Sequence, residues 1–126
     1  MATLEVFRND PNARPFYAGD VIFEDGSTTH DEMYVVVDGQ VDIITHGRHV
    51  ETVGPGGIFG EMALVDRGPR SASAIAKTDG KLVAINEKRF LYLVGNTPYF
   101  ALEVMRTLAT RVRHMNEAIE AAPGPT

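Results

Sequence analysis

Short runs of β-branched and apolar residues alternate with turn residues over the first two thirds of the chain. The runs cover residues 21–23, 33–37, 41–45, 50–53, 72–76 and 82–85. Turn signals separate them, and Asp38-Gly39 predicts a tight hairpin, because a type I′ turn needs positive φ at both central positions. Many short strands at roughly ten-residue spacing are typical of an antiparallel sandwich or barrel.

The hydrophobic period changes from strand-like to helical after residue 86. Asn86 can cap a short helix over residues 87–94, which Gly95-Asn96 would end. Thr97-Pro98 is typical of an N-cap followed by the first helical position, and predicts a long helix over residues 98–122. A helix of about 25 residues extends roughly 37 Å. We therefore expect part of it to project from a small domain or to meet a partner.

The long helix carries a stripe of apolar residues at alternating spacings of three and four, the heptad pattern of a two-helix contact. These residues are Met105, Leu108, Val112, Met115, Ile119 and Ala122. We expect the first part, through Leu108, to pack on the chain's own β-region, and the second part to form a homodimer seam. The alternative is that the whole stripe packs within the chain.

The length and composition indicate one water-soluble domain. At 126 residues, the chain has room for a single core, so we expect one domain over residues 1–126 with its β-region at 12–86. The content of 44% hydrophobic and 23% charged residues excludes collagen-like and disordered classes. No apolar run approaches the ~18 residues of a membrane span, and the first ten residues lack the apolar core of a secretory signal. A cytoplasmic protein without a membrane partner is expected.

Cysteine content and net charge exclude further classes. The absence of cysteine removes disulfide scaffolds and thiolate metal sites. A net charge of -5 disfavours a nucleic-acid surface, which needs clustered Lys and Arg to displace phosphate counterions. Any anion must be held by a local arrangement, since the overall field repels it.

One glycine-rich segment offers such an arrangement. A strand ends before Gly60, whose lack of a side chain lets the backbone approach a ligand. A short helix beginning at Glu61 would present unpaired backbone N–H groups that favour an anion. A turn then presents Arg70, whose guanidinium can bind two phosphate oxygens together, and the Ser71 hydroxyl adds a donor. The segment predicts a phosphate cradle.

Glu61 fits this cradle if it accepts hydrogen bonds from a neutral ribose hydroxyl while Arg70 neutralises the phosphate. Considered alone, Glu61 is equally well explained as a first-turn acid that complements the helix dipole and pairs with Arg67 or Arg70. The complete segment favours the first interpretation.

Residues 59–72 resemble the phosphate-binding cassette of the cyclic nucleotide-binding domain family, which is Phe-Gly-Glu-(Leu or Met)-Ala-Leu, a variable turn, and Arg-(Ser, Thr or Ala)-Ala. The resemblance extends over roughly residues 16–119. It implies an antiparallel β-roll of the double-stranded jelly-roll type, followed by a short helix and a long C-terminal lid helix. The N-terminal helical segment that is common before the roll is expected to be abbreviated, because Asp10-Pro11 and Arg14-Pro15 favour extended chain.

The resemblance also implies roles for individual residues. Glu61 would hold the ribose 2′-hydroxyl, Arg70 the cyclic phosphate, and Ser71 the phosphate or the base edge. The ligand-binding residues implied in the cassette are Phe59, Gly60, Glu61, Met62, Ala63, Arg70, Ser71 and Ala72. The lid residues implied as base contacts are Arg111, Arg113, Met115 and Asn116. For Arg111 and Arg113, a solvated helix face is the alternative.

Cyclic AMP is favoured over cyclic GMP because of the family's prevalence in bacteria, and Ser71 decides little. Binding would move the C-terminal helix. Since this sequence shows no DNA-binding, kinase or channel segment after that helix, we expect the signal to pass to another copy of the chain, to a separate effector protein, or to a region of the protein that this sequence does not include.

Two other functions fit the sequence less well. A structural or docking roll without ligand is disfavoured, because a degenerate cassette would be expected to lose the buried charges of Glu61 and Arg70. An enzyme is not expected, since the residues form no catalytic constellation. The histidines do not have metal-ligand spacing with an acid, so we expect neither a metal nor a cofactor; they are His30, His46, His49 and His114.

Overall fold

The computed structural model describes residues 2–28, 31–65 and 68–121, without the side chains of residues 2, 3, 115 and 118–121. These residues form eight strands in two four-stranded antiparallel sheets, ordered β1-β8-β3-β6 and β2-β7-β4-β5. The strands are β1 (Arg14–Phe16), β2 (Val21–Phe23), β3 (Glu32–Asp38), β4 (Val41–Thr45), β5 (Arg48–Val53), β6 (Ile58–Phe59), β7 (Ser73–Ala76) and β8 (Gly80–Asn86). The helices are α1 (Ala2–Phe7), α2 (Met62–Val65), α3 (Glu87–Asn96) and α4 (Pro98–Ala121).

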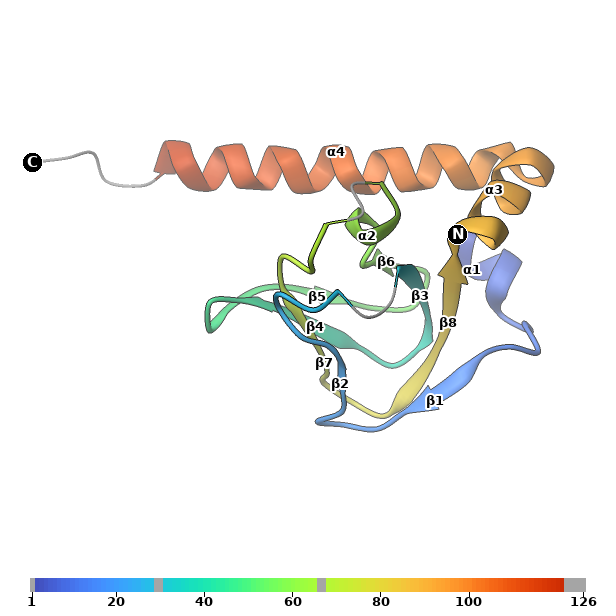
Figure 1. The fold of residues 1–126 in the computed structure, drawn as a ribbon, viewed down its shortest axis with the longest axis horizontal. Helices are drawn as coiled ribbons and strands as arrows, with labels where there is room; N and C mark the ends of the chain where they lie inside the picture. The colour runs from blue at the N-terminus through green and yellow to red at the C-terminus, as the bar shows by residue number, and fades with distance from the viewer. Residues whose placement is uncertain (1, 29–30, 66–67, 122–126) are drawn as a thin grey trace, which may run out of the picture.

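The strand pairing confirms the predicted double-stranded jelly roll. β1 pairs with β8, β2 with β7, β3 with β6 and β4 with β5, all antiparallel. The chain therefore doubles back once, at the β4–β5 turn, and the resulting double strand wraps into two facing sheets (Figure 1). That turn has the positive φ angles of a type I′ hairpin, 51° at His46 and 76° at Gly47.

The hairpin predicted at Asp38-Gly39 is wrong. β3 and β4 lie in different sheets, and among these two turn residues only Gly39 has positive φ (82°). The turn is a corner between the sheets, and it packs against the equivalent corner at Asp79-Gly80. A Cβ on Gly39 would lie 2.3 Å from the Asp79 carbonyl oxygen, so glycine serves close backbone approach here.

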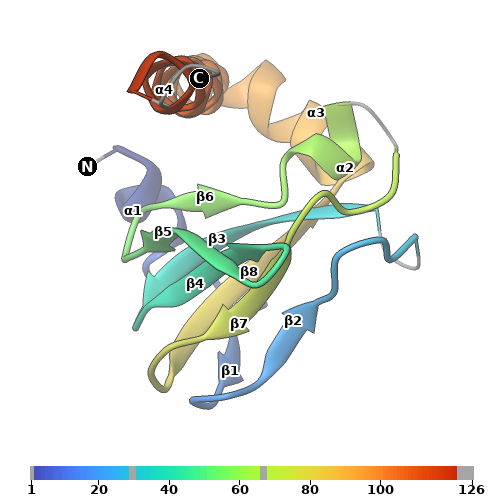
Figure 2. The same cartoon turned by 90° about the vertical axis from the view of Figure 1, so that its left-hand side faces the viewer.

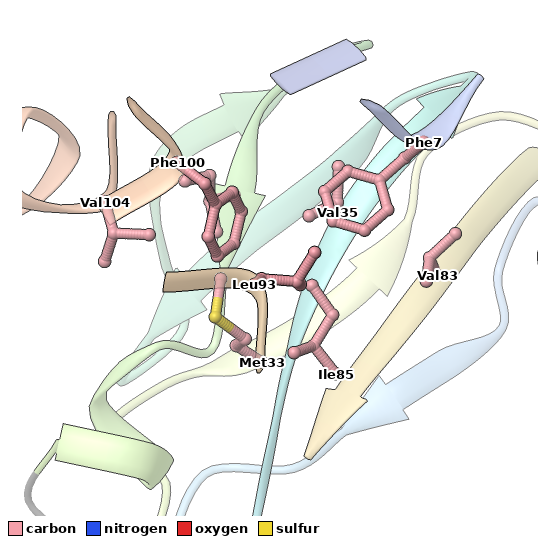
Figure 3. Close-up of a cluster of buried hydrophobic side chains, with 9 residues drawn as sticks. Phe7, Met33, Val35, Val83, Ile85, Leu93, Phe100 and Val104 are labelled. Carbon is pink, nitrogen blue, oxygen red and sulfur yellow. The ribbon is translucent and has the colours of Figure 1, made fainter. Parts of the chain in front are cut away.

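Alternating side chains of the first sheet form two cores. In β3, Tyr34 and Val36 face the second sheet, whereas Met33 and Val35 face the helices. Both faces are buried, which explains why this strand is an uninterrupted apolar run in the sequence. Figure 3 shows the core on the helix side, where side chains of α1, α3 and α4 meet those of β3 and β8.

The N-terminal residues depart from the predicted extended chain. Residues 2–7 form α1, and Phe7 of this helix packs edge-on against Phe100 of α4, with ring centroids 5.7 Å apart. The interruption by Asp10-Pro11 is therefore confined to the segment between α1 and β1. A helix this short is not stable alone, and packing of Phe7 in the core contributes to holding it.

The C-terminal helices begin where the sequence predicted. Asn86 caps α3 by accepting a hydrogen bond from Arg89 N, at 2.9 Å. This helix continues through Gly95-Asn96 rather than ending at residue 94, and Thr97 caps its C-terminus with an N–H bond to Leu93 O. Pro98 then begins α4, which extends beyond the strands (Figure 1). Figure 2 looks along α4 and shows the helices on one side of the roll.

The predicted seam of α4 is partly corrected. Leu108 packs on the chain's own core as expected, but Met105, assigned to the same packed half, is 58% exposed. Val112 is also exposed, at 56%. The side chains of Met115 and Ile119, and all of Ala122, lie outside the described residues.

In the part of the chain that the structure describes, no helix is long and apolar enough to cross a membrane.

Candidate functional site

The cassette lies between the end of β6 and the start of β7. Phe59 ends β6, Gly60 turns the chain, and α2 begins at Met62, one residue later than predicted. α2 lies on the same side of the roll as α4 but is displaced sideways from it in the end-on view (Figure 2). After this helix the chain returns to the roll, where Arg70 N donates to Ser27 O (2.9 Å) and Arg70 O accepts from Gly26 N (2.7 Å). Two loops far apart in sequence thus fix the backbone of Arg70.

Gly60 lacks a side chain for two separate reasons. Its φ is +75°, a conformation that L side chains rarely adopt. A Cβ there would lie 2.8 Å from Arg70 Nη1, so a side chain would also displace the guanidinium. The Gly60 carbonyl accepts from Arg70 Nη1 (2.9 Å) and from Ala63 N (3.2 Å). This glycine therefore links the turn of the cassette to the position of its arginine.

Arg70 is buried, with 6% of its surface exposed. Its Nη2 donates to Glu32 O at 2.8 Å, and its guanidinium carbon lies 4.1 Å from the centre of the Phe23 ring. Burial lowers the pKa of Arg70, although Tyr34 and nearby carboxylates, Glu61 among them, act in the opposite direction. Arginine titrates so far above neutrality that the group stays cationic. The roll therefore holds a fixed positive charge at the cassette.

Glu61 is also buried, with 4% of its surface exposed. Its Oε1 accepts from Arg111 Nη1 of α4. Its Oε2 is buried and has no hydrogen-bond partner among the described residues. The predicted alternative that Glu61 forms an ion pair with Arg70 is wrong, because Glu61 pairs with Arg111 instead. The other arginine considered, Arg67, lies outside the described residues. A buried carboxylate oxygen without a donor is costly, so Oε2 is available to accept a further hydrogen bond.

Arg111 joins α4 to both sides of the cassette. Besides Glu61, it donates from Nε and Nη2 to the two oxygens of Glu51 (3.0 and 3.2 Å) and from Nη2 to Ile58 O (2.5 Å). Burial lowers the pKa of Arg111, but the bonds to Glu51 and the charge and bond of Glu61 outweigh it and leave the pKa raised. The solvated-face interpretation is wrong for Arg111, whereas Arg113 is exposed.

Glu51 was missed by the sequence analysis. It lies 60 residues from Arg111 and belongs to a strand whose polar residues alone carry no sign of a ligand site. Glu51 and Arg111 meet only because α4 lies along the β5–β6 segment in the folded chain. No local pattern in the sequence could have indicated this contact.

The remaining predicted residues differ in exposure. The Phe59 side chain is buried between the sheets, with its ring 5.2 Å from that of Tyr34, and Ala63 is buried too. Met62, Ser71 and Asn116 are exposed, and Ala72 is intermediate. The structure thus brings together the Gly60 backbone and the side chains of Glu61, Arg70 and Arg111. The side chain of Met115 lies outside the described residues.

The three histidines in the described part of the chain are all exposed. His46 and His49 are exposed on the β4–β5 hairpin and His114 is exposed on α4. Within the described ranges, no three His, Asp or Glu side chains form a group that could hold a metal ion. His30 lies outside those ranges.

The family model of the cyclic nucleotide-binding domain matches residues 13–97. The "Cyclic AMP receptor protein" of Thermus thermophilus is 37% identical over 109 residues, which is 82% of this chain and 47% of the relative. The chain therefore spans about half the length of this curated relative.

Two solved structures extend the comparison. The Thermus thermophilus Catabolite Activator Protein superposes with a TM-score of 0.78 at 31% identity, over 94% of this chain and 58% of its own. The protein of "A cyclic-GMP-dependent signalling pathway regulates bacterial phytopathogenesis" superposes with a TM-score of 0.74 at 30% identity, over 90% of this chain and 94% of its own.

Proposed function

Because this chain belongs to the cyclic nucleotide-binding domain family, we propose that it is a sensor that binds a cyclic nucleotide at the cassette and transmits occupancy through α4. The observation that carries the proposal is the buried Glu61 Oε2, an acceptor without a partner among the described residues, in the same cradle as the buried cation of Arg70. A cyclic nucleotide supplies both complements, a neutral ribose hydroxyl and an anionic phosphate.

Arg70 is assigned to the cyclic phosphate and Glu61 to the ribose 2′-hydroxyl. Phosphate oxygens would replace or join the carbonyl acceptors of Gly60 and Glu32, with charge-assisted bonds that are stronger than neutral ones. Ser71, exposed beside Arg70, would contact the phosphate or the base edge. This local charge allows anion binding despite the net charge of -5.

Signal transmission is assigned to the contact between Glu61 and Arg111. A ligand hydroxyl on Glu61 and the guanidinium of α4 share one carboxylate, so binding changes the interactions that hold α4 over the cassette. We expect α3 and α4 to shift together, because they are packed on each other and on α1 through Phe90, Phe100 and Phe7. Arg113, Met115 and Asn116 are the other proposed lid contacts.

Cyclic AMP is the proposed ligand, with cyclic GMP second. The name of the Thermus relative refers to cyclic AMP, whereas one similar structure comes from work on a cyclic GMP pathway. We propose that the protein binds the nucleotide without converting it chemically. Its proposed protein partners are a second copy of the chain, in a homodimer, and a separate effector protein.

Calorimetric titration of the chain with cyclic AMP and cyclic GMP tests the proposal, with linear 5′-AMP as the control. We expect saturable binding of the cyclic nucleotide, tighter for cyclic AMP, and a rise in the unfolding temperature, because the ligand binds only the native state. Recovery of unchanged nucleotide is expected after prolonged incubation. No heat and no thermal shift with either cyclic nucleotide would reject the proposal and favour a ligand-free docking module.

A further inference from the structure

Arg111 lies between two carboxylates that come from different parts of the roll. Glu51 is on β5, Glu61 follows β6, and Arg111 reaches both from α4. Three quarters of the Arg111 side chain is buried, since 24% is exposed. The contact occupies the wall of a groove of about 530 Å³ between α4 and the β5–β6 segment, which Glu51 and Arg111 both line.

The two carboxylates bind different edges of the guanidinium. Both Glu51 oxygens accept from the Nε and Nη2 edge, at 3.0 and 3.2 Å, whereas Glu61 accepts from Nη1. A guanidinium is planar, so a bidentate partner on one edge fixes the direction in which the remaining N–H groups point. Among these three side chains, Glu51 thus contacts only Arg111. Together with Ile58 O, which accepts from Nη2 at 2.5 Å, it constrains the plane of the guanidinium.

We propose that Glu51 is a positioning residue that orients Arg111 toward Glu61, and thereby sets both the affinity for the nucleotide ribose and the attachment of α4 to the cassette. This inference rests on the proposed function, since it assigns a further residue to the same site. With Arg111 fixed, Glu61 Oε1 has a permanent donor and only Oε2 is left for the ligand hydroxyl. With Glu51 neutralised, Arg111 loses its bidentate partner and keeps the bond from Nη2 to Ile58 O, so its direction toward Glu61 is less constrained.

Glu51→Gln tests the inference by titration with cyclic AMP and with its 2′-deoxy analogue. We expect about tenfold weaker binding of cyclic AMP, as for loss of a charge-assisted pair, and a smaller preference for the ribo over the deoxy ligand. Glu103→Gln is the matched control. Glu103 lines the same groove but pairs with Arg106 of α4, so its neutralisation should leave affinity and preference unchanged. Unchanged or tighter cyclic AMP binding by Glu51→Gln would overturn the inference.

A double-mutant cycle separates positioning from general stability. If Glu51 acts through Arg111, Glu51→Gln adds nothing to the loss of affinity caused by Arg111→Gln. Additive losses would show that Glu51 acts by another route and would overturn the inference. Thermal unfolding of each variant monitors the fold.

A measurement without ligand makes the inference independent of the binding test. The Arg111 Nε–H signal in ¹H–¹⁵N spectra of the free protein should lose its protection from solvent exchange in Glu51→Gln and keep it in Glu103→Gln and Glu61→Gln. An unchanged signal in Glu51→Gln overturns the positioning role even if cyclic AMP binds. If the wild type binds no cyclic nucleotide, the proposed function fails while this signal still decides whether Glu51 positions Arg111.

Discussion

Gly60 and Arg70 constrain each other. The carbonyl of Gly60 accepts from Arg70 Nη1, and the missing Cβ of Gly60 leaves the room that this guanidinium occupies. The guanidinium also contacts the Phe23 ring and donates to Glu32 O, while the backbone N–H of Arg70 donates to Ser27 O. Such preorganisation lets a site bind an anion without first ordering a long side chain.

Gly60→Ala should therefore lose binding as well as stability. Forcing an L residue into positive φ costs roughly 1–2 kcal/mol, and the new methyl group would also push Arg70 aside. Gly19→Ala is the control, because Gly19 has φ +92° but nothing within 4 Å of its virtual Cβ. Urea unfolding and nucleotide titration of both variants measure the two effects. Equal behaviour of the two alanine variants would contradict the role of space at Gly60.

Arg70→Ala should weaken cyclic nucleotide binding by about 2–5 kcal/mol, as when one partner of a buried charge pair is truncated. Arg70→Lys keeps the charge but has no planar fork, so an intermediate loss is expected. Titration calorimetry gives the affinities, and circular dichroism confirms the fold of each variant. Affinity like that of the wild type in Arg70→Ala would exclude Arg70 from the phosphate site.

The sequence was informative about this site where its residues are adjacent. The cassette residues, the turn at Gly60 and the charges of Glu61 and Arg70 all lie within one short segment. The partner of Glu61 could not be predicted, because Arg111 is 50 residues away and reaches it only through the path of α4. A helical spacing identifies the face of a helix but not the segment that this face covers.

Strand positions were predicted well, but the hairpin predicted at Asp38-Gly39 was wrong. Alternation and β-branched content depend on local burial, so the runs before Asp38 and after Gly39 are strands as expected. A turn sequence, by contrast, determines backbone angles and not the sheet that the next strand joins. The Asp-Gly corners carry the chain from sheet to sheet, whereas the true hairpin at His46-Gly47 has a less typical sequence.

That hairpin carries a small polar cluster that should make its stability depend on pH. Asp42 Oδ1 accepts from Thr52 Oγ1 (2.7 Å) and lies 3.1 Å from His49 Nε2. Burial raises the pKa of Asp42, but the bonds from Thr52 and His49 and the charge of His49 outweigh it, so this pKa lies below its ordinary value of 3.8. A lowered carboxyl pKa contributes stability that is present above pH 3.8 and lost as pH falls further.

Asp42→Asn should accordingly destabilise the protein by about 1 kcal/mol near neutral pH, with a difference from the wild type that shrinks below pH 3.8. Thr52→Val removes the main donor and should show the same trend. Urea unfolding at neutral and acidic pH measures the difference. A difference that stays constant with pH would mean that Asp42 acts through packing instead of charge.

In the whole molecule, the long helix has more surface than the roll covers. Its inner face packs on the core through Phe100, Val104 and Leu108. Another face remains open, where Leu102, Met105 and Val112 are exposed apolar residues at spacings of three and seven. This exposed stripe has heptad spacing but differs from the predicted one: it includes Leu102 and lacks Leu108, because Leu108 packs on the core. We propose that a second copy of the chain packs its α4 on this stripe.

Val112→Glu should separate the two copies without unfolding either. A charge at the centre of an apolar two-helix seam is unpaired and desolvated on association, which disfavours the dimer, whereas in a single copy Val112 is 56% exposed and the change is tolerated. Val50→Glu, at a valine of β5 that is 61% exposed, is the matched control and should leave association unchanged. Sedimentation velocity over a range of concentrations measures the association of both glutamate variants. Leu108→Ala, by contrast, should lower the unfolding temperature, because it opens a cavity against the core. If Val112→Glu and the wild type sediment alike as dimers, the copies associate through another surface, and signalling through α4 would have to act within one copy.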